Sequence, residues 1–183
     1  MGDDVVDEVF SVVDAARKGD HDAWETLYRR VYPRLRAFVA GRIGATSVDD
    51  VVNETMTRAV ASISRFDWEP SGFDAWIFGI ARHVCLDEHR AAARRAKLPR
   101  RLFDPQAAVP APGERLERVD DLERMRSLVR RLAPAEREVL ELRITAGLSA
   151  EDTARILRSS PGAVRTAQSR ALAHLRRLWD SDQ

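Results

Sequence analysis

The chain has 183 residues, enough for one domain or two small ones, and its 44% hydrophobic content can supply a folded core. Its single cysteine excludes a disulfide framework and a zinc site built from several cysteines. No run of about 18 apolar residues is present, and the acidic first residues do not resemble a signal peptide. The 30 Lys and Arg residues nearly balance the 29 Asp and Glu residues. This near-neutral total does not exclude nucleic-acid binding, because the charges are distributed unevenly.

Opposite charges are concentrated in different parts of the chain. Residues 1–28 carry eight acidic and two basic residues, whereas residues 76–101 and 143–179 each carry seven basic and two acidic residues. Two separate basic segments favour two contacts with a polyanion. A run of charge also fits an ordinary solvated face, so the charge distribution alone leaves both interpretations open.

Apolar residues recur at helical spacing before residue 97, and no stretch alternates as a strand would. We therefore predict an all-α fold. Gly19 is expected to end the first helix, and Pro33 to kink or break the second. Ser47 and the acidic residues after it resemble a capping box that opens the third helix, and residues 64–72 are expected to form a loop. The helices of this part of the chain are predicted at about 1–19, 24–39, 48–63 and 73–96.

Four of the eight prolines lie between residues 98 and 113. Proline removes a backbone donor and restricts the residue before it, so we predict a flexible linker at residues 98–114. Apolar spacing after the linker predicts a helix that ends near Ala133. Pro134 then occupies the first position of the next helix, which Gly147 ends.

The last two predicted helices have the pattern of a helix-turn-helix motif. Ser149 caps a short helix, and Ser160 with Pro161 opens a longer basic helix that ends near Trp179. An ordinary helical hairpin is the alternative, but the two caps and the arginines of the second helix favour DNA binding. The N-terminal half of a recognition helix meets the base edges of the major groove, where arginine can bind guanine and glutamine can bind adenine. The residues expected there are Arg165, Thr166, Gln168, Ser169 and Arg170.

Motifs in both parts of the chain resemble those of one bacterial protein family. Residues 132–140 (LAPAEREVL), 147–154 (GLSAEDTA) and 162–165 (GAVR) resemble region four of a sigma factor. Residues 49–55 (DDVVNET) resemble the polymerase-binding helix of region two, and residues 73–83 (FDAWIFGIARH) resemble its promoter-reading helix. The order of these motifs, with no room for an additional middle domain, resembles the minimal extracytoplasmic-function (ECF) sigma factors.

The resemblance implies an all-α protein of two small helical domains joined by the flexible linker. Region two would cover residues 20–97 after an acidic helix at 1–19, and region four would cover 115–180. The implied function is that of a transcription initiation factor rather than an enzyme. It would bind core RNA polymerase, direct it to specific promoters and help to melt the minus-ten element. The implied partners are core polymerase, promoter DNA and an anti-sigma factor in the cytoplasm, without a cofactor, a metal, a small-molecule substrate or a membrane span.

The resemblance implies three sets of binding residues, at the positions of this chain that match the family's motifs. The core-polymerase set is Asp49, Asp50, Val52, Asn53 and Glu54. The minus-ten set is Phe66, Asp67, Trp68, Arg82, His83, Asp87 and Arg90. The minus-thirty-five set consists of the five residues predicted above for the final helix. Asp49 and Asp50 also have a simpler possible role, which is to stabilise the N-terminus of their helix, as acidic residues do there in general.

Four residues depart from the family's usual pattern, and one of them is Ala163, which stands where threonine is common. His83 stands where the family usually has asparagine and Asn53 where it usually has glutamine, so promoter preference is expected to differ. Arg158 stands near the turn where glycine is common, and a left-handed backbone there would cost about 1 kcal/mol. Trp76 is expected to pack in the core rather than to contact a base.

Other classes of protein were weighed against this interpretation. A metal site or an enzyme could be built from His83, Cys85, Asp87 and His89, but helical spacing places them on two faces, so four ligands would not converge. A one-component regulator would explain the basic C-terminal helix but not the motifs of region two. An anti-sigma-like interaction module would explain the helices but would leave both basic segments without a role.

Overall fold

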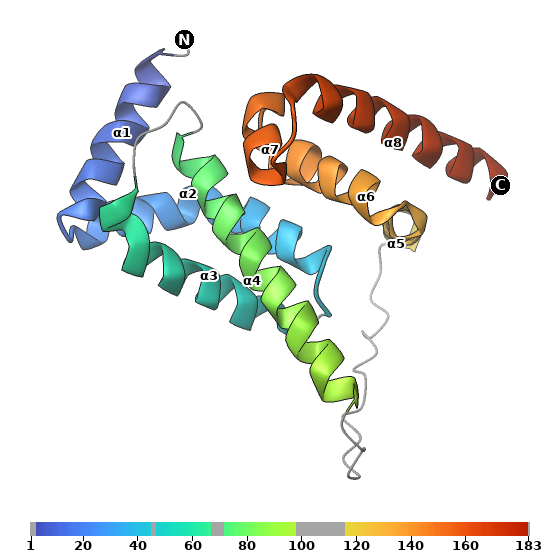
Figure 1. Cartoon of the computed structure of the whole chain (residues 1–183), viewed down its shortest axis with the longest axis horizontal. Helices are drawn as coiled ribbons and strands as arrows, with labels where there is room; N and C mark the ends of the chain where they lie inside the picture. The colour runs from blue at the N-terminus through green and yellow to red at the C-terminus, as the bar shows by residue number, and fades with distance from the viewer. Residues whose placement is uncertain (1–2, 45–46, 67–71, 98–115, 183) are drawn as a thin grey trace.

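The computed structural model describes residues 3–44, 47–66, 72–97 and 116–182 (Figure 1). All regular structure within these ranges is helical, which confirms the predicted fold class. Among the described helices, none is both long and apolar enough to cross a membrane. The predicted linker at residues 98–114 lies outside the described residues.

The N-terminal half of the structure, residues 3–97, is built around α2. Helices α1, α3 and α4 all pack against it. The bounds in this half are α1 (Asp3–Arg17), α2 (His21–Ala40), α3 (Val48–Ser62), the short 3-10 helix η2 (Ile63–Arg65) and α4 (Gly72–Lys97).

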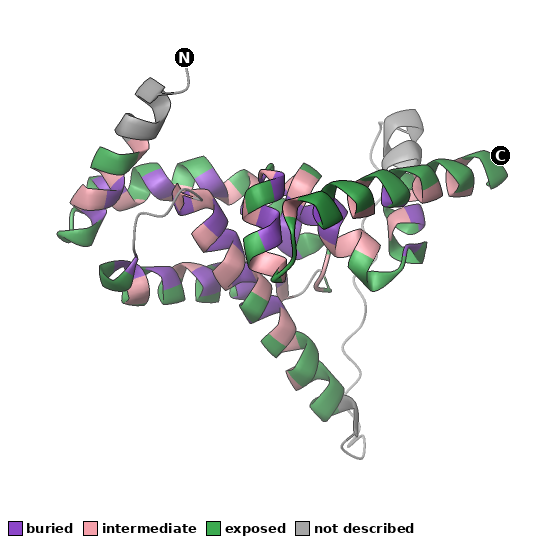
Figure 2. Ribbon diagram, turned by 45° about the horizontal axis from the view of Figure 1, so that its top comes forward, coloured by how far each residue is buried: buried purple, intermediate pink, exposed green. Residues whose placement is uncertain are grey.

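A buried apolar stripe along α2 explains this arrangement. Leu27, Val31, Leu35 and Phe38 recur at steps of three or four residues, and each is at most 1% exposed. The ring of Phe38 meets that of Phe78 of α4 edge to face, with 5.3 Å between centroids. Figure 2 shows the buried residues concentrated where these helices meet.

The C-terminal half, residues 116–182, packs around α8. Helices α5, α6 and α7 all contact α8. The bounds are α5 (Leu116–Arg131), α6 (Pro134–Leu140), the π-helical turn η3 (Glu141–Thr145), α7 (Ala150–Leu157) and α8 (Pro161–Ser181). The Ser149 hydroxyl accepts from the Asp152 amide at 2.9 Å, and the Ser160 hydroxyl accepts from the Ala163 amide at 3.1 Å. Both predicted caps of the helix-turn-helix motif are therefore confirmed.

Two local predictions, a break of the helix at Pro33 and a side-chain cap at Ser47, are wrong. Helix α2 does not break at Pro33, because the buried residues on both sides of the proline hold the helix against its neighbours and offset one missing hydrogen bond. Ser47 precedes α3 but makes no side-chain capping bond. Its backbone, at φ −113° and ψ 4°, lacks the extended conformation of a good N-cap, and Asp49 pairs with Arg36 instead.

The two halves share one hydrophobic core. Leu142, Ala146 and Leu148, from η3 and the loop after it, are at most 4% exposed and belong to the same buried cluster as the core of α2 and α4. Helix α7 packs against α4 and η3 packs against α2, although the linker separates these segments in sequence (Figure 1). Leu142 of η3 thus packs against the N-terminal half, whereas Ile144 of the same turn is exposed.

Arg158 occupies the turn of the helix-turn-helix motif in a left-handed conformation, with φ 53° and ψ 49°. It is the one non-glycine residue with positive φ among the described residues. The turn therefore has the left-handed backbone geometry that glycine adopts most easily. A side chain with a Cβ is strained in that conformation, by roughly 1–2 kcal/mol.

We expect Arg158→Gly to raise the free energy of unfolding by about 1 kcal/mol, because glycine adopts the left-handed conformation without the steric cost. Urea unfolding of the full chain would measure this change. Arg158→Ala is the matched control, since it removes the side chain but keeps the Cβ. An equal gain in stability for both variants would contradict the assignment of strain to the backbone.

Candidate functional site

The residues predicted to bind polymerase lie on α3, and four of the five are exposed. These four are Asp49, Asp50, Asn53 and Glu54. Val52 is only 1% exposed and belongs to the core, so its predicted contact with a partner is wrong. Helical geometry is the reason, since Val52 points toward α2 and α4 with the other apolar residues of α3. The surface that α3 exposes is therefore an acidic and amide surface without this valine.

An arginine outside the predicted sets joins this surface to α4. Arg58 donates from Nε to Glu54 at 2.7 Å and from Nη1 to Asp87 at 3.0 Å. Asp87 also pairs with Arg90, with 3.5 Å between oxygen and nitrogen. The hydrogen bonds from Glu54 and Asp87 raise the pKa of Arg58. The spacing of Glu54 and Arg58 could have revealed the first contact from the sequence, but the contact between helices could not be read from it.

The aromatic part of the predicted minus-ten set is corrected by the structure. Phe66 is only 5% exposed, and its ring lies 5.0 Å from that of Trp76 and 6.3 Å from that of Phe73. It therefore fills the core and offers no free face on which a base could stack. Trp76 packs against the same core, as predicted. Asp67 and Trp68 lie outside the described residues.

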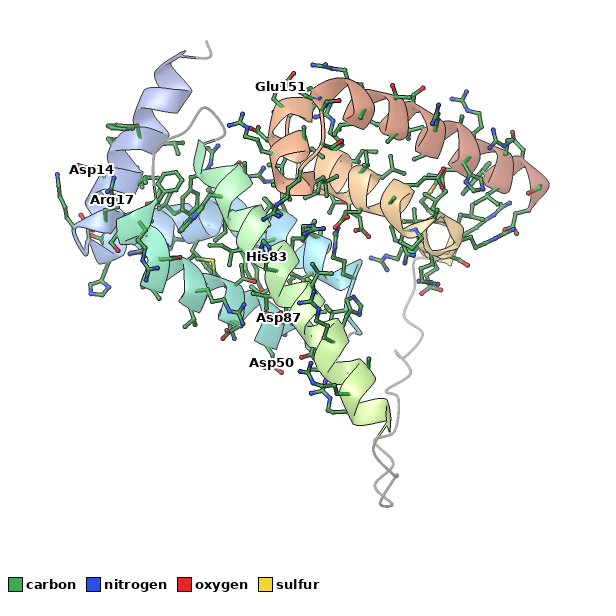
Figure 3. All side chains as sticks on the ribbon, in the orientation of Figure 1. Asp14, Arg17, Asp50, His83, Asp87 and Glu151 are labelled. Carbon is green, nitrogen blue, oxygen red and sulfur yellow. The ribbon has the colours of Figure 1, made fainter. Side chains whose placement is uncertain are left out.

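The remaining members of this set lie along α4. His83, Asp87 and Arg90 are exposed, and Figure 3 shows His83 and Asp87 about one turn apart on this helix. The His83 ring contacts the Gly79 carbonyl through Nδ1 at 2.8 Å, which leaves its outer edge to solvent. Arg82 differs from the others because it faces the C-terminal half, where its Nε donates to Glu138 at 2.8 Å.

The predicted minus-thirty-five residues lie in the first three turns of α8. Arg165, Thr166, Ser169 and Arg170 are exposed there. Arg165 forms an ion pair with Glu151, which Figure 3 labels on α7 beside the start of α8. Gln168 is half-buried and accepts from Arg143 Nε at 2.8 Å. The amide oxygen of Gln168 is thus already bonded within the protein.

A buried charge cluster between the two halves was missed by the sequence analysis. Arg42, two residues beyond α2, forms an ion pair with Glu141 of η3, and its second nitrogen lies 3.8 Å from Glu138 of α6. The guanidinium also stands over the ring of Phe38, 3.8 Å from its centroid. Burial raises the pKa of Glu141 to about 7, although Arg42 acts in the opposite direction, and burial lowers the pKa of Arg42. This cluster could not be predicted from the sequence, because its charged residues lie far apart in the chain.

Metal binding finds no support in the part of the chain that the structure describes. No three His, Cys, Asp or Glu side chains there are grouped so that they could hold an ion. Cys85, one of the four residues weighed as ligands, is buried, whereas His89 is exposed.

The two halves match two known families in the predicted order. Residues 27–95 match the family described as Sigma-70 region 2, and residues 122–175 match Sigma-70, region 4. The chain is 34% identical over 172 residues to the ECF RNA polymerase sigma factor SigD of Mycobacterium tuberculosis, with 91% of this chain and 81% of that protein covered. The chain belongs to the ECF sigma factor family. It is therefore a transcription initiation factor that directs RNA polymerase to promoters.

Further relatives and solved structures agree with this assignment. The ECF sigma factor BldN of Streptomyces coelicolor is 28% identical over 176 residues, with 95% of this chain and 67% of that protein covered. The solved structure of CnrH in complex with the cytosolic domain of CnrY is similar, with a TM-score of 0.71, 29% identity and coverage of 94% and 97%. The sigma factor RpoE in complex with the anti-sigma factor NepR from Bartonella quintana gives a TM-score of 0.67 at 26% identity, with coverage of 87% and 98%.

The raised pKa of Glu141 predicts a pH dependence of stability. A carboxyl whose pKa rises from 4.5 to about 7 on folding stabilises the folded state fully below pH 4.5, and this stabilisation is lost as the pH rises through 7. We expect the wild type to lose at most about 3 kcal/mol of unfolding free energy over this range from this group. Glu141→Gln should remove that loss.

Urea unfolding at several pH values between about 5 and 8 would measure this difference. Glu123→Gln, at an exposed position of α5, is the matched control and should keep the wild-type pH dependence. If Glu141→Gln and the wild type lost stability in parallel, the titration of Glu141 would not be the cause.

Proposed function

We propose that the chain contacts polymerase and promoter through three separate helical surfaces. The acidic and amide surface of α3 docks on a basic partner helix of core polymerase. The exposed side of α4 contacts the minus-ten element, and the first turns of α8 contact the minus-thirty-five element. The family assignment and the exposure of these residues support all three proposals.

One observation carries the proposal furthest, namely the arrangement of α7 and α8. Two capped helices are joined by a tight left-handed turn, and the longer helix exposes Arg165, Thr166, Ser169 and Arg170 in its first three turns. A recognition helix meets the major groove with this part of its surface. The arginines can donate to guanine or to phosphate, whereas Gln168 is held by Arg143 and contributes by positioning that arginine.

The proposed minus-ten surface combines α4 with the segment before it. His83, Asp87 and Arg90 provide polar and basic groups along α4, and Arg58 fixes the position of Asp87. A melted promoter must receive an unstacked base, which needs an aromatic face or a pocket. Because Phe66 is in the core, we assign this role to Trp68 with Asp67 beside it.

The proposed domain limits and partners follow from the same assignment. We assign region two to residues 20–97, the linker to 98–114 and region four to 115–180. The first helix, within residues 1–19, buries Val13 and Ala16 in the core, which supports a structural role beside region two. Two structural neighbours were solved with partner proteins, one of them an anti-sigma factor, and we propose that an anti-sigma factor also binds this chain. We further propose that it acts in the cytoplasm without a cofactor and without catalysing a reaction.

Run-off transcription tests the proposed function directly. The purified full chain and core RNA polymerase would be supplied with a library of genomic promoter fragments. We expect transcripts from a subset of promoters only when the chain is present. A chain that neither bound core polymerase nor gave promoter-dependent transcripts would refute the proposal.

The minus-thirty-five surface can be tested with Arg165→Ala/Arg170→Ala. We expect holoenzyme with this variant to bind upstream promoter duplex at least tenfold more weakly, since each base or phosphate contact is worth about 1–3 kcal/mol. Electrophoretic mobility shift at several salt concentrations would measure the loss. Arg176→Ala/Arg177→Ala, at exposed positions near the end of the same helix, is the control and should bind nearly as the wild type does. Loss of core association by the first variant would contradict the assignment of α8.

The polymerase surface can be tested with Asp50→Asn. Asp50 is exposed in the first turn of α3, so its substitution should leave the core of the domain unchanged. We expect core polymerase to bind this variant several-fold more weakly, because an acid that faces a basic partner is lost. Fluorescence titration with core polymerase would measure the affinity. Glu25→Gln, on the exposed side of α2, is the matched control, and equal affinities for the two variants would contradict the docking surface.

A further inference from the structure

An exposed carboxylate stands beside one of the arginines proposed to contact the minus-thirty-five element. Arg165 of α8 donates through a single guanidinium nitrogen, Nη2, to Glu151 in the first turn of α7. The side chains of Arg165 and Glu151 are 60% and 50% exposed, and Figure 3 shows Glu151 beside the start of α8. DNA that reached this part of α8 would therefore meet the pair and not an isolated arginine.

The stability of the fold does not account for this pair. Exposed ion pairs contribute little to the free energy of unfolding, because water and salt screen them. The carboxylate is nevertheless held in its charged form. A hydrogen bond from its own backbone amide, followed by Arg165 and then Arg143, lowers the pKa of Glu151. The main physical effect of Glu151 is therefore on the charge and the position of Arg165.

Two predicted base-reading side chains of α8 are each held by a residue outside this helix. Glu151 of α7 holds Arg165, and Gln168 accepts from Nε of Arg143 at 2.8 Å. Arg143 of η3 is fixed in turn by the bond that it donates to the Leu148 carbonyl. Arg170 is different, since it is exposed and has no carboxylate partner among the residues that the structure describes. The two arginines of this surface thus have unequal environments.

Guanine and phosphate require different properties of an arginine. Guanine presents two neutral acceptors, O6 and N7, and their recognition needs a guanidinium in a fixed orientation. A phosphate carries a full negative charge and encodes no sequence, so its attraction depends on the positive charge that is available. Glu151 fixes and neutralises Arg165 but occupies only one of its nitrogens. Arg165 therefore keeps the donors that guanine needs and loses much of the charge that attracts phosphate.

We propose that Glu151 is a specificity-determining residue, which holds Arg165 for a guanine of the minus-thirty-five element and disfavours its contact with phosphate. Arg170, which lacks such a partner, contacts the phosphate backbone. Glu151 acts through Arg165 and is therefore a positioning residue. Holding the long side chain in advance also lowers the entropy lost when it binds a base. This inference rests on the proposed role of α8 in promoter binding.

Glu151→Gln tests the positioning, because it keeps the size of the side chain and removes its charge. Holoenzyme would be assembled from core polymerase and the full chain on a promoter found by run-off transcription, with each position of its minus-thirty-five element varied in turn. We expect the variant to lose about fivefold in its preference for guanine at one position. Arg165→Ala should lose the preference at that same position, and Glu151→Gln should then have no further effect. Glu123→Gln, at an exposed position of α5, is the matched control and should keep the wild-type preference.

Binding of the free full chain to a random-sequence duplex tests the discrimination against phosphate. We expect Glu151→Gln to bind about threefold more tightly than Glu123→Gln, with a dependence of log affinity on log salt that is steeper by about one unit, because Arg165 becomes available to phosphate. Arg170→Ala should weaken binding to every sequence alike. Circular dichroism would check the helix content, and Glu151→Ala would replace the glutamine variant if that variant failed to fold.

The outcomes separate this inference from the proposed function. An unchanged base preference in Glu151→Gln, with Arg165→Ala still altering it, would overturn the role of Glu151 and leave the proposed role of α8 intact. Weaker binding of Glu151→Gln to both promoter and random DNA would also overturn it, since that result indicates a merely structural role. Full promoter affinity in Arg165→Ala and in Arg165→Ala/Arg170→Ala would instead refute the proposed role of α8 itself.

Discussion

The buried stripe of α2 is the interaction on which the rest of the structure depends. Leu27, Val31, Leu35 and Phe38 are nearly inaccessible, and α1, α3, α4 and η3 all contact this helix. At about 0.8 kcal/mol for each buried methylene group, the stripe supplies a large part of the driving force for folding. It also orients α3 and α4, so the acidic surface of one and the basic surface of the other point outward from the same core. A single helix therefore determines the positions of the proposed polymerase and promoter contacts.

Arg42 lies two residues beyond the same helix, where apolar packing gives way to buried charge. A lone guanidinium would be expensive to bury, and the carboxylates of Glu138 and Glu141 together with the Phe38 ring offset that cost. Since those carboxylates come from the other side of the linker, the N-terminal half satisfies its own arginine only when the C-terminal half is in place. The desolvation that raises the pKa of Glu141 is a direct consequence.

Local features were predictable from the sequence, whereas contacts between distant segments were not. The caps at Ser149 and Ser160 each depend on a few neighbouring residues, and the structure confirms them. Phe66 and Val52 were misassigned because the sequence around a motif does not show whether an aromatic or apolar side chain is exposed or buried. The packing of α3 and α4 decides this, and it buries both side chains. Arg58, Arg42 and Glu138 were missed for the related reason that their partners lie on other helices.

The near-neutral net charge of the chain, from 30 Lys and Arg residues and 29 Asp and Glu residues, includes many charges that are paired within the protein. Arginines that would attract DNA are paired within the protein, Arg82 with Glu138 and Arg165 with Glu151. Each pair lowers the electrostatic attraction of the free chain for DNA, because non-specific affinity scales with the number of cations available to phosphates. A polyanion that competes for these arginines must displace a carboxylate, and the exchange is nearly balanced in charge. Under the proposed function, polymerase-bound promoter DNA competes for these arginines more effectively than free DNA does, because it adds base contacts and a fixed geometry.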